Sequence, residues 1–135
     1  MQEKDIMAEA RQFMGSRVLL SAAELDIFTS LEDGPATARD LSLAKGLDER
    51  ATERLLNSLV VNGYLKKTSG RYGLSEEGAC LSANHPRSML PMIRHMIHVW
   101  NNWSRLTETV IQGVNTERES VTELSGQKQR DFIEA

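Results

Sequence analysis

The sequence predicts a mainly α winged helix, which is a helix-turn-helix followed by a small β-hairpin wing, with further helices before and after it. Two helical patterns separated by Gly46 predict the helix-turn-helix. Two short strand patterns around Ser69-Gly70 predict the wing. A long apolar repeat over residues 88–112 predicts a long C-terminal helix.

Two helical patterns precede the helix-turn-helix. In the first, over residues 5–14, the apolar side chains form one stripe, and Gly15 is expected to end the helix. The second runs from Arg17 to Leu31 and is apolar over a wider arc than one surface face requires, so we expect it to be covered on two sides. The stripe of the first helix consists of Ile6, Met7, Ala10, Phe13 and Met14.

Capping residues mark both helices of the helix-turn-helix. Thr37 is the expected N-cap of a helix over residues 38–45, with Asp40 three positions on in the manner of a capping box. Gly46 is expected to end that helix. Asp48 is the expected N-cap of the next helix, whose apolar residues recur at helical spacing until Gly63.

Residues 64–84 predict the wing and a final short helix. Strands are expected over 64–68 and 71–74, joined by a tight Ser69-Gly70 turn with positive φ angles. Ser75 is the expected N-cap of the helix that follows, where Glu76 and Glu77 favour the first turn electrostatically.

The longest periodic segment gives one expected helix over about residues 88–112, with Pro91 tolerated in its first turn. We expect residues 1–113 to form one winged-helix domain. Residues 114–135 are expected to be a linker followed by the start of another helix. Since the sequence stops within that helical pattern, we expect a piece of a longer protein.

Composition excludes several classes of protein. The net charge of −3 gives no general attraction to nucleic acid or to anionic lipid. A single cysteine, Cys80, excludes an intramolecular disulfide framework and predicts a cytoplasmic location. No apolar run is long enough to span a membrane, and the N-terminus lacks the pattern of a signal peptide.

The predicted recognition helix is unsuited to DNA. Asp48, Glu49 and Glu53 outweigh Arg50 and Arg54 there, whereas phosphate contacts require cations. A winged-helix transcriptional regulator therefore remains only the alternative function.

The apolar faces of the helices instead predict a homodimer, because they exceed what so small a domain can cover internally. We expect no nucleic-acid or membrane partner. The candidate dimer-interface residues are Val18, Leu19, Ala22, Met92, Met96, Val99, Trp100 and Trp103.

Several segments, taken in order, resemble one family, the N-terminal dimerisation domain of S-adenosylmethionine-dependent O-methyltransferases of the caffeate and antibiotic-tailoring type. The likeness covers nearly the whole chain. It is carried by AELDIF at 23–28, GPATARDL at 34–41, LDERATERLL at 47–56, NGYL at 62–65, RYGLSEEG at 71–78, WSRLTETVIQG at 103–113 and DFIEA at 131–135.

The resemblance implies a domain that dimerises and forms part of the wall of a substrate cleft. In the family the S-adenosylmethionine site and the catalytic His–acid pair lie in a following domain, and this sequence contains no G-x-G-x-G loop. We therefore expect no catalytic, cofactor-binding or metal-binding residue in this chain, and S-adenosylmethionine together with a small-molecule acceptor in the full-length parent. The candidate pocket residues are Phe13, Met14, His98 and Asn102.

Overall fold

The computed structural model describes residues 3–114, except for the side chain of Lys4, and confirms the mainly α winged helix. The chain divides into two units between Ser88 and Met89. The boundary at 88/89 falls inside the segment expected to be one domain. The predicted linker and helix start over 114–135 lie outside the described residues, apart from Val114.

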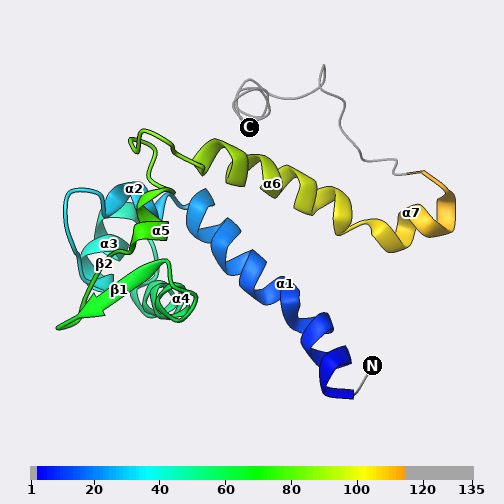
Figure 1. Ribbon diagram of the computed structural model, residues 1–135, viewed down its shortest axis with the longest axis horizontal. Coiled ribbons are helices and arrows are strands. Elements are labelled where there is room, and N and C mark those ends of the chain that lie inside the picture. Colours follow the sequence, from blue (N-terminus) through cyan, green and yellow to red (C-terminus); the bar gives the residue numbers. More distant parts are fainter. Residues whose placement is uncertain (1–2, 115–135) are drawn as a thin grey trace. The chain divides into compact units, whose positions relative to one another are not determined.

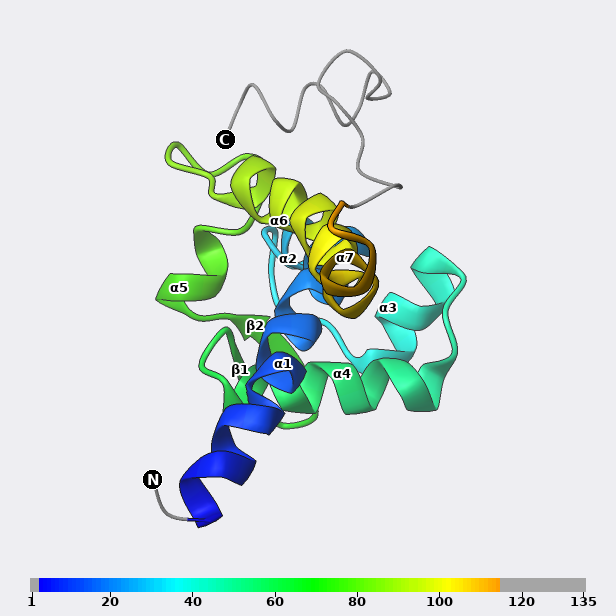
Figure 2. The same ribbon diagram turned by 90° about the vertical axis from the view of Figure 1, so that its right-hand side faces the viewer.

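The first unit contains a bundle of helices and the wing (Figures 1 and 2). Within it, α1 packs on α2 and α4, α3 packs on α4, α4 packs on β1, and α5 packs on β2. The elements are α1 (Glu3–Glu24), α2 (Ile27–Ser30), α3 (Ala38–Lys45), α4 (Glu49–Val61), β1 (Leu65–Thr68), β2 (Arg71–Leu74) and α5 (Glu76–Ala79).

The predicted break at Gly15 is wrong, because α1 runs through this residue to Glu24. A single glycine lowers helix stability by only about 1 kcal/mol relative to alanine, so it need not end a helix. The predicted helix over 17–31 is instead interrupted at Asp26, whose φ of 54° is left-handed. This residue separates α1 from the short helix α2.

The predicted caps of the helix-turn-helix are confirmed. The Thr37 hydroxyl accepts a hydrogen bond from the backbone N–H of Asp40 at 3.0 Å, and an Asp48 carboxylate oxygen accepts one from the N–H of Ala51 at 2.8 Å. Gly46 ends α3 with a left-handed φ of 68°. These local contacts satisfy backbone groups that helix ends leave without intrahelical partners.

The wing forms in the predicted register, with its first strand starting one residue later than expected. Leu65 pairs with Leu74 and Thr68 with Arg71, and the turn residues Ser69 and Gly70 both have positive φ. Ala36 adds an isolated antiparallel bridge to the hairpin, since it exchanges two backbone hydrogen bonds with Tyr72 at 2.8 and 3.0 Å. This bridge ties the turn before α3 to the wing.

Ser75 joins the wing to α4 and α5. Its hydroxyl donates to the carbonyl of Gly63 at 2.6 Å and accepts from the N–H of Gly78 at 3.1 Å, which confirms the predicted cap. The core around these elements is aliphatic, with Phe28 and Tyr72 as its fully buried aromatic side chains. Its other large members are Leu20, Ile27, Leu31, Leu41, Leu56, Leu59, Leu65 and Leu81.

The second unit contains α6 (Leu90–Trp103) and α7 (Leu106–Gln112), so the prediction of one unbroken helix over 88–112 is wrong. The interruption lies at Ser104 and Arg105. The Ser104 hydroxyl donates to the carbonyl of Trp100 at 2.9 Å, a contact that bends helices, and the N–H of Arg105 bonds to the carbonyl of Asn102 three residues back.

Candidate dimerisation surface

The N-terminal part of α1 presents an apolar stripe to solvent. Every described side chain between residues 3 and 16 is exposed, and we call this segment the arm. Ile6 and Phe13 are each 53% exposed, whereas Leu20, at the same spacing of seven, is only 6% exposed. Residues seven apart lie nearly on one line along a helix, so the face that enters the core at Leu20 continues uncovered along the arm.

The same side of the arm carries Met7, Ala10 and Met14, which completes the stripe predicted from the sequence. Beyond the stripe α1 carries an ion pair, in which the Arg17 guanidinium lies 3.3 Å from the Glu24 carboxylate. Both partners are partly exposed, so this pair contributes little to stability. The exposed apolar side chains of α1 all lie within the arm.

A second apolar face lies on α6. Met92, Met96 and Trp103 are exposed, and their spacing of four and seven residues places them on one side of the helix. Trp103 has 66% of its surface accessible to solvent. Val99 and Trp100, also predicted interface residues, are partly exposed on the same helix.

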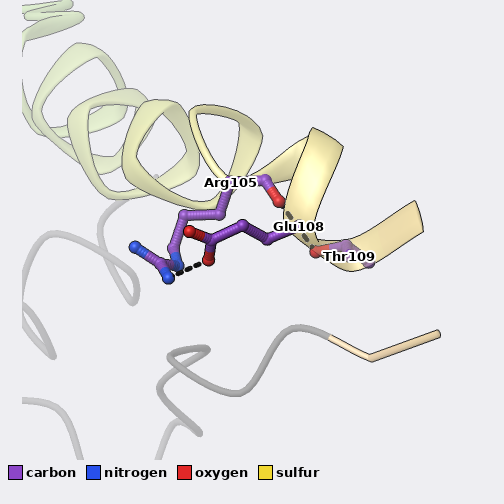
Figure 3. A network of polar contacts seen from close by, with 3 residues as sticks. All are labelled: Arg105, Glu108 and Thr109. Atoms are coloured by element: carbon purple, nitrogen blue, oxygen red, sulfur yellow. Dashed lines mark hydrogen bonds and ion pairs between the residues drawn. The ribbon is translucent and has the colours of Figure 1, made fainter. Parts of the chain in front are cut away.

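The helix α7 extends this apolar surface after the interruption. Leu106, Val110 and Ile111 are exposed there. Figure 3 shows the polar contacts that hold its first turn: the Arg105 guanidinium pairs with the Glu108 carboxylate, and the Thr109 hydroxyl donates to the carbonyl of Arg105 at 3.1 Å. The sequence prediction left these three apolar residues out, although Leu106 and Val110 belonged to the apolar repeat.

The remaining predicted interface residues lie close to the core of the chain itself. Val18 and Leu19 are partly exposed. Ala22 is completely buried within a single copy, so we correct its assignment from interface to core. A small apolar side chain is suited to a helix interface as well as to a core, and the position of Ala22 in the helical repeat does not distinguish between the two.

The four predicted pocket residues lie in different units. Phe13 and Met14 are exposed neighbours on the arm, whereas His98 and Asn102 are partly buried on α6. His98 and Asn102 are four residues apart and share a face of the helix. The His98 ring also meets the His95 ring edge-on, with 6.5 Å between centroids.

The helix-turn-helix presents mixed charge to solvent. Glu49, Arg50, Glu53 and Arg54 are all exposed on α4, as predicted. On the wing, the ammonium group of Lys67 donates to the amide oxygen of Asn57 at 3.3 Å and lies 5.0 Å from the centre of the Tyr72 ring. Lys67 is thus engaged in contacts within the chain.

Within residues 3–114, no three histidine, cysteine or acidic side chains gather as metal ligands would. The helices of this described part are also too short or too polar to cross a membrane.

The described fold is a winged helix with exposed apolar residues on the arm and, separately, on α6 and α7, which is typical of a protein-association domain. Its class follows from comparison with known proteins. Residues 7–84 match the family described as the O-methyltransferase dimerisation domain, which is more than half of the chain, and this chain belongs to that family.

Individual relatives agree with the family. O-methyltransferase SfmM3 of Streptomyces lavendulae is 34% identical over 100 residues, which are 73% of this chain and 30% of the relative. The S-adenosyl-L-methionine-dependent methyl transferase PigF of Serratia sp. is 28% identical over 80% of this chain and 32% of its own length. The chain thus spans about a third of the curated relatives it matches.

A solved structure extends the likeness to the fold. The crystal structure of the N,N-8-amino-8-demethyl-D-riboflavin dimethyltransferase RosA from Streptomyces davawensis superposes with a TM-score of 0.82 at 26% identity. The match covers 99% of this chain and 43% of that protein.

Proposed function

We propose that this chain is the dimerisation and pocket-shaping part of an S-adenosylmethionine-dependent small-molecule O-methyltransferase. Three facts support the proposal: the family, the names of the relatives, and the share of their length that the chain spans. The rest of such a protein would supply the S-adenosylmethionine site and the catalytic base. This chain would make the contacts to the partner subunit and would form part of the acceptor pocket.

The proposed dimer joins two copies of this chain through the arm and the exposed faces of α6 and α7. One observation carries the proposal. Leu20, Phe13 and Ile6 lie along one face of α1, and this face is buried at Leu20 but exposed at Phe13 and Ile6. An apolar face of this kind gains free energy when a second surface removes it from water. Aromatic residues such as Trp103 are frequent anchors of such interfaces.

We also propose two sets of acceptor contacts, each within its own unit: Phe13 and Met14 on the arm, and His98 and Asn102 on α6. Phe13 and Met14 offer apolar surface to the flat part of an acceptor, while His98 and Asn102 offer hydrogen-bonding groups that fix its orientation. None of these side chains needs to take part in methyl transfer. In the complete protein a general base would take the proton of the acceptor hydroxyl, and the acceptor oxygen would receive the methyl group from the sulfur of S-adenosylmethionine, which would leave as the neutral thioether.

Sedimentation velocity of this chain, from low micromolar to high micromolar concentration, tests the dimer. We expect a concentration-dependent shift from monomer to dimer. Trp103→Ala should raise the dissociation constant about 30-fold, the effect of removing an interface hot spot. Since Trp103 is exposed in one copy, the monomer should keep its fold.

Asn101→Ala is the matched control, because Asn101 is exposed on another side of α6. It should leave the dissociation constant unchanged. A wild-type chain that stays monomeric throughout this range would contradict the proposal. Calorimetric titration with S-adenosylmethionine should give heat of binding with the complete protein and none with this chain.

A further inference from the structure

We propose that the arm keeps its helix only when a second copy of this chain covers it, so that folding of the arm and dimerisation are one coupled event. The inference rests on the proposed function, because it requires a dimer. It adds a property of the interface, namely that the helical arm of each copy forms only when the two copies associate.

The first argument is the lack of tertiary support along the arm. All of its described side chains are exposed, so burial contributes little to its stability in one copy. In water, helices shorter than about 12–15 residues are marginal even in favourable sequences. The folded half of α1 nucleates the helix, but propagation towards Glu3 gains no help from buried side chains.

Gly15 makes that propagation harder. It lies where the arm joins the supported half of α1, and a glycine inside a helix costs about 1 kcal/mol relative to alanine. Apart from the neighbouring backbone of α1 itself, no atom of the described residues lies within 4 Å of the position that a Cβ would occupy there. Packing among the described residues therefore does not require a glycine at this position. The helix stability that Gly15 removes must be offset by contacts with another surface.

The second argument identifies the occupant. The exposed stripe continues a face that is already packed at Leu20, and the family match, which is to a dimerisation domain, begins at Met7 within the arm. Because the family is described as a dimerisation domain, we take the partner to be a second copy of this chain. Burying Ile6, Met7 and part of the Phe13 and Met14 side chains against it would provide the free energy that the isolated arm lacks, and the rest of those two side chains can still face an acceptor.

Amide hydrogen exchange of the whole chain, followed by mass spectrometry at several protein concentrations, tests the coupling. We expect amides of residues 6–16 to be protected when the chain is dimeric and to lose protection as dilution separates the copies. Amides of α4 and the wing should remain protected throughout. Sedimentation under the same conditions gives the fraction of dimer at each concentration.

Two variants that each introduce a glutamate sharpen the test. Phe13→Glu places the charge on the stripe, and Gln12→Glu places it one residue away from the stripe, also at an exposed position. Glutamate favours helix more than phenylalanine does. Even so, Phe13→Glu should weaken the dimer at least about 30-fold and remove arm protection, whereas Gln12→Glu should preserve both.

The two proposals fail in different ways. If the wild-type chain dissociates on dilution while residues 6–16 stay protected, the coupling is wrong and the dimer stands. The coupling is also wrong if Phe13→Glu separates the copies and leaves arm protection intact. A wild-type chain that is monomeric at every concentration removes the proposed function as well.

Discussion

The carboxylate of Glu32 accepts a hydrogen bond of 2.5 Å from the hydroxyl of Ser82, which lies 50 residues later in the chain. The side-chain amide of Asn84 donates to the other carboxylate oxygen at 2.7 Å. The backbone N–H of Ala83 donates to the hydroxyl of Thr29 at 2.9 Å. Three successive residues are thereby held to the end of α2, at the place where the chain leaves the winged-helix unit.

This contact predicts a dependence of stability on pH. Hydrogen bonds from Ser82 first, and then from Asn84, lower the pKa of Glu32 below its ordinary value of 4.5. A carboxyl group with a lowered pKa in the folded state stabilises the fold above its unfolded pKa, and that contribution is lost as the pH falls through the folded pKa. Glu32→Gln should therefore lose less stability than the wild type between pH 6 and pH 3.

Urea unfolding at a series of pH values measures this difference. Glu53→Gln, which neutralises another exposed carboxylate, is the control and should follow the wild type. If the free energy of unfolding falls equally for Glu32→Gln and the wild type between pH 6 and pH 3, Glu32 is not the source of the pH dependence.

A second prediction concerns Gly78 in α5. A Cβ at this position would lie 2.0 Å from the backbone carbonyl oxygen of Tyr64, and a backbone atom has little room to move aside. Gly78→Ala should therefore lower the free energy of unfolding by about 3 kcal/mol or more, at or above the upper end of ordinary overpacking. Thermal or urea unfolding measures the loss.

Gly15→Ala is the matched glycine control, because a Cβ there meets nothing within 4 Å. It should raise the helical circular dichroism signal, since alanine favours helix by about 1 kcal/mol relative to glycine. Equal effects of the two substitutions on stability would show that the close approach at Tyr64 relaxes without cost.

A third prediction separates the two partners of a part-buried hydrogen bond. The Tyr72 hydroxyl donates to the amide oxygen of Asn57 at 2.6 Å, and the Tyr72 side chain is buried. Tyr72→Phe removes the donor and leaves Asn57 with Lys67, which should cost about 1 kcal/mol. Asn57→Ala removes the acceptor of both donors and should cost more, about 2 kcal/mol.

Denaturant unfolding of both single variants and of the double variant measures the coupling. The double variant should lose less free energy than the sum of the single losses, because the residues share one contact. Full additivity would contradict an energetic role for the hydrogen bond.

A fourth prediction concerns the alternative function as a DNA-binding regulator. Acidic and basic groups alternate on the exposed side of α4, and Lys67 of the wing is held by Asn57. We expect no binding to random duplex DNA in fluorescence anisotropy at physiological salt. Micromolar binding that weakens steeply with added salt would instead support the regulator, because phosphate contacts release counterions.

Local features of the fold were predictable from the sequence. Thr37, Asp48 and Ser75 cap helices because each side chain reaches a backbone N–H three residues away, which depends on no distant contact. The wing register likewise follows from its two-residue turn. The sequence prediction was wrong at Gly15, where the helix continues, and at Ser104–Arg105, where the long helix is interrupted although its apolar repeat continues.

The sequence by itself determined the winged helix, its caps, its hairpin and its resemblance to a dimerisation domain, because these depend on short-range geometry and on the order of motifs. Only the tertiary structure decided which apolar residues are covered within one copy. Ala22 and Phe13 both lie on α1, yet one is fully buried and the other is half exposed. The helical repeat in the sequence defines the side of a helix on which a residue lies. Whether that residue is buried depends on how far along the helix the other elements pack against it.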